Sequence, residues 1–155
     1  MRRLATLFCV TFLGAAPLAA ADGALSPVDA WKADPTMMFN AAEVDLDTFK
    51  WVARPVVVFA DTPEMPAFQS QIDLLTARAD ELVKRDVVLI LDTAPAETSD
   101  IRRKLRPRGF MLVLIGKDGG VKLRKPFPWD VRELSRQIDK MPIRQQEIRD
   151  ALTSE

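Results

Sequence analysis

Four short hydrophobic runs stand out along the chain, and each has the pattern of a β-strand. The runs are 56–60, 87–91, 110–115 and 121–124. The first three are apolar at every position, which is typical of strands buried on both faces of a sheet. In the last run, lysine and arginine alternate with Val121 and Leu123, as expected of an edge strand with one solvated face. The sequence therefore predicts three buried strands and one edge strand.

Apolar residues recur at helical spacing between and after these runs. A long helix is predicted over 66–85 from one apolar stripe that comprises Phe68, Ile72, Leu75, Ala79, Leu82 and Val83. A shorter helix is predicted from a cap at Thr98 or Ser99 to Leu105. The pair Asp130 and Glu133 predicts a capping box that opens a helix ending at Met141. A tail helix beginning at Pro142 would turn inward its apolar residues Ile143, Ile148 and Leu152.

The order of these elements defines a fold class. The first two strands and the helix between them predict a right-handed βαβ crossover with parallel strands. Asp118-Gly119 between the last two strand patterns predicts an antiparallel hairpin. The result is an α/β domain with the order β-α-β-α-β-β-α and a mixed four-stranded sheet, which is a thioredoxin-like core. The hairpin argues against a doubly wound domain, which would need further βα units in its place.

The segment before this core has a weaker pattern. A short helix is predicted around 45–51, with Leu46 and Phe49 facing inward. Residues 22–44 are interpreted as a lead segment laid along the domain of residues 45–155. Trp31 and Trp51 are expected to fasten that segment to the core.

The first residues have the three parts of a secretory signal peptide. Met1-Arg2-Arg3 supplies positive charge, 4–13 is apolar, and Ala19-Ala20-Ala21 provides a small-residue cleavage site before Asp22. We therefore expect cleavage after residue 21 and a periplasmic or secreted protein without a stable membrane span. The alternative is an uncleaved membrane anchor, which the short apolar run and Pro17 disfavour.

Composition narrows the chemistry available to the exported chain. The whole chain has 22 basic and 22 acidic residues, and loss of Arg2 and Arg3 with the signal peptide leaves a net charge near −2, so there is no electrostatic case for nucleic-acid binding. The chain has no histidine, and its one cysteine, Cys9, lies in the predicted signal peptide. The exported part can therefore form no disulfide, and it has poor means of binding zinc or of general-base catalysis near pH 7. No cofactor is expected.

The absence of cysteine matters most at the joint after the first buried strand. In a thioredoxin-like domain this joint carries a Cys-x-x-Cys pair at a helix N-terminus. Here the joint reads Asp61-Thr62-Pro63-Glu64-Met65-Pro66. The sequence thus predicts the scaffold of a redox protein without thiol–disulfide oxidoreductase chemistry.

Several motifs also resemble a known family. They are the stretches 54–60, 85–88, 110–124 and 141–147, among which Leu114-Ile115-Gly116-Lys117-Asp118-Gly119-Gly120 is the most specific. They resemble the bacterial "domain of unknown function 4174" family, over roughly residues 45–149. The resemblance implies a thioredoxin-like fold without an established reaction and, in animals, domains within secreted matrix-associated and sushi-repeat proteins. By comparison with working thioredoxins, Met111 falls where their cis-proline would lie.

Two groups of residues are candidates for a site. Asp61 and Asp92 each follow a predicted strand, so they could share a metal ion or divide acid and base roles at the carboxyl edge of the sheet. The structural alternative, which we favour, is that they cap turns. The second group could form an interaction surface for an anionic ligand or acidic partner, or could simply be solvated, and comprises Arg102, Arg103, Arg106, Arg108, Lys117 and Trp129. The favoured hypothesis is a binding or interaction module, and the alternative is an enzyme or metal-binding domain that uses Asp61 and Asp92.

Overall fold

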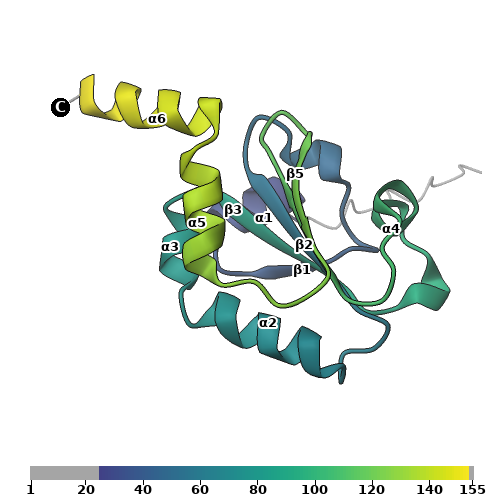
Figure 1. Ribbon diagram of the computed structural model, residues 1–155. Helices are drawn as coiled ribbons and strands as arrows, with labels where there is room; N and C mark the ends of the chain where they lie inside the picture. Colours follow the sequence, from purple (N-terminus) through teal and green to yellow (C-terminus); the bar gives the residue numbers. More distant parts are fainter. Residues whose placement is uncertain (1–24, 154–155) are drawn as a thin grey trace, which may run out of the picture.

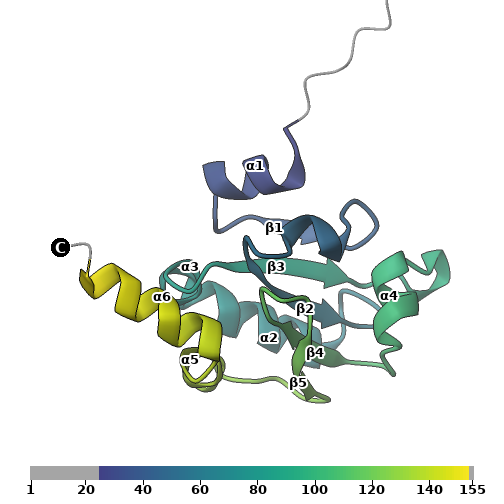
Figure 2. The ribbon, with the colours of Figure 1, turned by 90° about the horizontal axis from the view of Figure 1, so that it is seen from above.

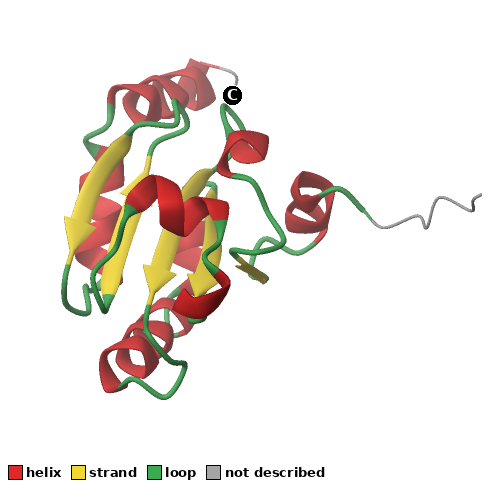
Figure 3. Ribbon diagram, turned by 90° about the vertical axis from the view of Figure 1, so that its right-hand side faces the viewer, coloured by secondary structure: helices red, strands yellow, loops and turns green. Residues whose placement is uncertain are grey.

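The computed structural model describes residues 25–153, which form a five-stranded mixed sheet with helices on both sides (Figures 1 and 3). The strands are β1 Met38–Asn40, β2 Arg54–Phe59, β3 Val87–Asp92, β4 Met111–Ile115 and β5 Val121–Lys125, in the order β1-β3-β2-β4-β5. The parallel pairing of β2 with β3 and the antiparallel hairpin of β4 and β5 confirm the sequence predictions.

The expected number of four strands was wrong, because the predicted lead segment contributes β1. This strand runs parallel to β3 and occupies one edge of the sheet. It has three residues, and only Phe39 of them is buried. Such a short strand has no alternation long enough to recognise in the sequence, and its pairing with β3 defines it.

Consecutive residues of the central strands supply two separate cores. All six residues of β2 are buried, and alternate side chains point to opposite faces. Val57 and Phe59 pack into one core, whereas Val56 and Val58 pack into the other. This double burial explains why the strand is apolar throughout.

Each face of the sheet is covered by its own helices (Figure 2). The helices of one face are α2 Pro66–Thr76, α3 Ala79–Val83 and α5 Val131–Asp139. The other face carries α1 Pro27–Ala33, the 3₁₀ helix η1 Leu46–Phe49 and α4 Asp100–Leu105. A second 3₁₀ helix, η2 Pro95–Glu97, precedes α4.

The helix predicted over 66–85 is two helices. Helix α2 ends at Thr76, and the backbone of Arg78 leaves the helical region at φ −135° and ψ 36°. Neither glycine nor proline marks this break in the sequence. After the break, α3 buries Leu82, and Arg85 binds Asp139 at the end of α5. The chain therefore bends between α2 and α3 and packs against α5 after the bend. The apolar stripe in the sequence gives no sign of this bend.

Helix α5 begins as predicted, but without a capping box. Asp130 accepts a hydrogen bond from the backbone of Arg132, at 2.6 Å. Glu133 pairs instead with Arg136 on the solvent side, so it does not return to the cap. The final helix, α6 Pro142–Thr153, projects from the body of the domain (Figures 1 and 2). Its predicted inner positions Ile143 and Ile148 are only half-buried, and Leu152 is exposed, because α6 has little of the domain to pack against.

The two tryptophans near the start have different roles. Trp31 is buried, and its Nε1 donates to the carbonyl of Val87 at 3.2 Å, which fastens α1 to the sheet as expected. The expectation for Trp51 was wrong, since 66% of this residue is exposed. The predicted signal peptide, residues 1–21, lies outside the described residues. Among the described residues, no helix combines the length and apolarity that crossing a bilayer requires.

Candidate functional site at the carboxyl-end rim

The rim is defined here as the loops that follow β2 and β3, together with the start of β4. At this end the backbone N–H of Ala60 donates to the carbonyl of Asp92 at 2.9 Å, which joins the two strand ends. The following loop, 61–64, is exposed, and α2 starts at Pro66. A thiol at this helix N-terminus would have a lowered pKa. The joint instead holds Asp, Thr, Pro and Glu, so the rim has no nucleophile of that kind.

Asp92 belongs to a buried ion pair. Arg102 Nη2 lies 2.6 Å from Asp92 Oδ1, and Arg102 Nε donates to the same oxygen at 2.9 Å. Ser99 Oγ donates to the other carboxylate oxygen at 2.7 Å, while it also caps α4 by accepting from the backbone of Arg102. Both oxygens of Asp92 are therefore engaged by α4.

The Arg102 guanidinium also ties together the ends of two strands. Its Nη2 donates to the carbonyls of Ala60 and Asp92, each at 3.0 Å, and its charge lies 5.4 Å from the centroid of the Phe59 ring. Arg102 therefore holds the ends of β2 and β3 together at the rim. We call Asp92, Ser99 and Arg102 the rim clamp.

Asp61 has different surroundings from Asp92. It is exposed, and its Oδ2 is directed towards Gly109, since a Cβ built on that glycine would lie 3.9 Å from this oxygen. The expected turn caps are also not formed: α2 has no side-chain cap, and Asp92 binds Ser99 and Arg102 instead. Across residues 25–153, no three His, Cys, Asp or Glu side chains gather as metal ligands.

Met111 opens β4 and is paired in register with Phe59, so it lies beside the end of β2. It is half-buried and packs against the core on the α4 side of the sheet. Arg124 Nη1 approaches its sulfur at 3.7 Å. The centre of the rim therefore presents a polarisable apolar side chain.

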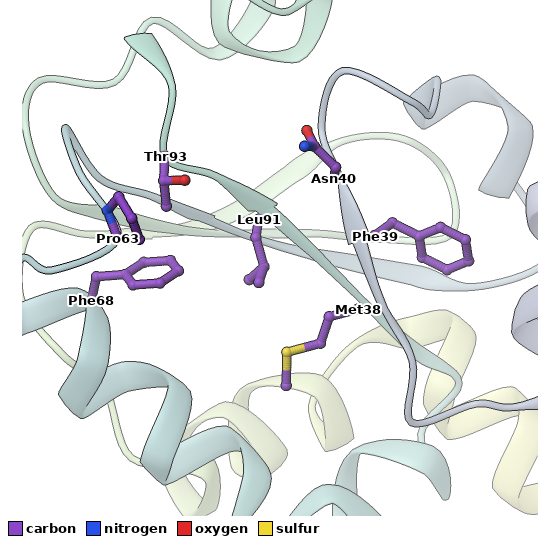
Figure 4. A pocket seen from close by; sticks show the side chains of 7 residues that line it. All are labelled: Met38, Phe39, Asn40, Pro63, Phe68, Leu91 and Thr93. Atoms are coloured by element: carbon purple, nitrogen blue, oxygen red, sulfur yellow. The ribbon is translucent and has the colours of Figure 1, made fainter.

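A hollow of about 320 Å³ opens beside the rim, where α2 leaves the β1 edge of the sheet uncovered (Figure 4). It is lined by Met38, Phe39, Asn40, Pro63, Phe68, Leu91 and Thr93. Met38 on β1 and Leu91 on β3 are only half-buried, although both pack against the core that contains Phe68 of α2. This hollow could not be predicted from the sequence, because three of its lining residues belong to β1, which has no recognisable sequence pattern.

The six residues of the predicted interaction surface lie in different places. Arg102 is in the rim clamp, and Arg103 pairs with Asp100 on α4. Arg106 and Arg108 are exposed just after α4. Lys117 lies in the β4–β5 hairpin at the opposite end of the sheet, where it binds Asp86 and Glu147.

Trp129, the sixth residue, precedes α5. Gln71 on α2 accepts from its backbone N–H at 2.7 Å and donates to its carbonyl at 3.1 Å. Lys125 Nζ lies 3.6 Å from the centroid of one of its rings, in a cation–π contact. Only Arg103, Arg106 and Arg108 therefore remain neighbours near the end of α4.

Comparison with solved structures places the fold among thioredoxin-like proteins. A reduced 2-Cys peroxiredoxin from Plasmodium vivax aligns with a TM-score of 0.53 at 18% identity, over 67% of this chain and 85% of the other. Thioredoxin peroxidase I from Plasmodium yoelii aligns with a TM-score of 0.52 at 19% identity, over 67% and 81%. At sequence identities this low, the structural similarity establishes the fold alone.

Sequence comparison then identifies the family. The profile of the family described as "Domain of unknown function (DUF4174)" matches residues 45–147, and the chain belongs to this family. A zebrafish (Danio rerio) protein named Coiled-coil domain-containing protein 80 is 30% identical over a matched length of 133, and the match covers 66% of this chain. The match spans only 15% of that longer relative.

Proposed function

We propose that the protein is an exported binding module built on a thioredoxin-like scaffold, without thiol–disulfide chemistry. The hollow beside the rim is the observation that carries this proposal. It lies next to the joint where related folds hold their thiols, and the joint here has no cysteine. The signal-peptide pattern supports a periplasmic or secreted site of action.

The ligand we assign to the hollow is an extended segment of a partner protein that carries an apolar anchor residue. The walls contributed by Met38, Phe68 and Leu91 are apolar and suit such an anchor. Beside them, β1 is the edge strand of the sheet. An edge strand can extend its hydrogen-bonding pattern to an added strand, and side-chain pockets then supply specificity.

Selection from a displayed library of random peptides tests this proposal. Enriched peptides should share an apolar residue and should lose at least tenfold in affinity for Met38→Glu, which places a charge in the hollow. The control is Lys84→Glu, an exposed site on the far end of α3. Failure to enrich any peptide, or equal binding to both variants, would contradict the proposal.

The alternative use of Asp61 and Asp92 as a metal or acid–base pair has a separate test. Thermal melts with and without Mg²⁺ and Ca²⁺ should coincide, because Asp92 is already neutralised by Arg102. A shift of several degrees that disappears in the Asp61→Ala/Asp92→Ala double variant would support the enzyme or metal-binding alternative.

A further inference from the structure

The methionines of the described chain differ in their exposure and in what surrounds them. Met141 is buried at 8% exposure, whereas the others are half-buried, namely Met37, Met38, Met65 and Met111. Met37 packs against the core on the α4 side of the sheet, and Met65 packs against the core on the α2 side. Among the described residues that line the hollow, Met38 is the one methionine. Met38 is therefore the thioether that the hollow opens to small molecules.

The side chain of Met38 forms part of the apolar wall of the hollow. It extends from β1 towards the side of the sheet that α2 covers, as Leu91 does from β3 (Figure 4). Phe68 of α2 belongs to the same core. The hollow has a volume of about 320 Å³, whereas a molecule the size of water takes up about 30 Å³. A small oxidant therefore has room to reach the Met38 sulfur.

The exported chain has no thiol that would compete for an oxidant. Residues 22–155 contain no cysteine. Cysteine and methionine are the two residues whose sulfur is oxidised in proteins, and their susceptibility follows exposure. An oxidant that meets the exported chain therefore reacts with the sulfur of its accessible methionines.

We propose that Met38 is an oxidation site that controls binding in the hollow, an inference that rests on the proposed function. The oxidant is a peroxide. The Met38 sulfur attacks one oxygen of hydrogen peroxide, and the O–O bond breaks as the S–O bond forms. The departing hydroxide takes the remaining proton and becomes water. The sulfur loses two electrons to the peroxide, and the product is methionine sulfoxide.

The sulfoxide changes the chemistry of the wall. An apolar, flexible side chain becomes a polar one that carries a hydrogen-bond acceptor. An apolar anchor seated in the hollow would bury this oxygen and offer it no donor, which costs free energy. Oxidation of Met38 therefore weakens binding of a partner that carries an apolar anchor. Enzymatic reduction of the sulfoxide restores the thioether and with it the binding.

Mass spectrometry of the protein without a partner tests the chemistry alone. After brief treatment with hydrogen peroxide, Met38 should gain one oxygen atom at least fivefold faster than Met141, which is buried. Fragment spectra separate Met38 from Met37, which should also react more slowly because it does not line the hollow. A peptide selected for binding to the hollow should slow the oxidation of Met38 and leave that of Met37 unchanged.

A matched pair of variants tests the effect on binding. Oxidised protein should lose at least tenfold in affinity for the selected peptides, and methionine sulfoxide reductase should restore the affinity. Met38→Leu keeps an apolar wall of similar volume, so it should bind the peptides before and after peroxide treatment. Met37→Leu is the control and should lose affinity on peroxide treatment, as the unmodified protein does.

Three results would overturn the proposal and leave the proposed function intact. They are oxidation of Met38 no faster than that of Met141, equal peptide affinity before and after complete oxidation of Met38, and loss of affinity in peroxide-treated Met38→Leu. A different result, the failure of any peptide to bind the hollow, would overturn the proposed function and this inference together.

Discussion

Two carboxylates that look equivalent in the sequence have different surroundings in the fold. Asp61 and Asp92 both follow a β-strand, but Asp61 is exposed, whereas Asp92 is 5% exposed and bound by Arg102 and Ser99. The strand-end position of each was predictable from the hydrophobic pattern. The partner of Asp92 was not, because it comes from α4, ten residues further on.

The rim clamp should therefore contribute much more stability than a turn cap. Asp92→Ala leaves the Arg102 guanidinium buried without its partner, which typically costs about 3–5 kcal/mol. Asp61→Ala removes an exposed side chain and should change stability by no more than about 0.5 kcal/mol. Urea denaturation measures both, and similar small losses would show that the clamp is not structural.

Glu147 on α6 gives a pH-dependent prediction, because Arg54, Lys117 and Arg144 all bind its carboxylate. Burial favours a higher pKa for the Glu147 carboxyl, but hydrogen bonds from Lys117 and Arg54 outweigh it and hold the pKa below its usual value. A lowered pKa in the folded state gives stability that is present above the unfolded-state pKa and is lost as the pH falls through the folded-state value.

Glu147→Gln should therefore destabilise the protein at pH 7, by roughly 1.5–3 kcal/mol for the lost charged hydrogen bonds. The difference from the unmodified protein should shrink as the pH falls below the ordinary range of glutamate. Denaturation curves between pH 7 and 3 measure this trend. Glu133→Gln is the control, since its exposed pair with Arg136 should be worth less than about 1 kcal/mol. A pH-independent loss in Glu147→Gln would contradict the assignment.

At the scale of elements, the sequence predicted what long apolar patterns determine. The central strands were predictable because both of their faces are buried, which makes them apolar throughout. The hairpin was predictable from Asp118-Gly119, and Gly119 does adopt a positive φ of 80°, which glycine allows. Strand β1 and the break between α2 and α3 were not found, because each depends on tertiary packing. The hollow was missed for the same reason, since β1 forms part of its wall.

The cap at the start of α5 gives a prediction about stability. Asp130→Ala should cost about 1 kcal/mol, because it removes the hydrogen bond from the backbone of Arg132. Asp130→Asn should be nearly neutral, since asparagine is an equally good cap. Thermal or urea unfolding measures the series. A capping-box contribution would appear instead as an equal loss in Glu133→Ala, which the observed pairing of Glu133 with Arg136 does not support.

At the scale of the whole molecule, the thioredoxin-like frame has a hollow near one end of β2 and an ion pair at the other. The hollow lies beside the carboxyl ends of the parallel strands, and the pair of Arg54 with Glu147 lies at the N-terminal end of β2. Buried ion pairs hold the frame closed near both, through Arg102 at one end and Arg54 at the other. Specific charged contacts thus brace a domain whose residues from 22 onward contain no cysteine.

A further prediction is that the newly synthesised chain is exported and cleaved. The charged start, apolar run and small residues before Asp22 should direct secretion and cleavage. N-terminal sequencing of protein recovered from cells should therefore read from about Asp22. Recovery of intact Met1 in the membrane fraction would indicate an uncleaved anchor.

The central claim, a thioredoxin-like scaffold used for binding without thiol chemistry, is tested most directly by an insulin-reduction assay. Thiol–disulfide exchange requires a thiolate, and residues 22–155 contain no cysteine. The purified exported chain should leave the rate of insulin reduction by dithiothreitol at the level of buffer, while a thioredoxin in the same assay accelerates it. Acceleration by a preparation shown to be free of contaminating thiols would contradict the account.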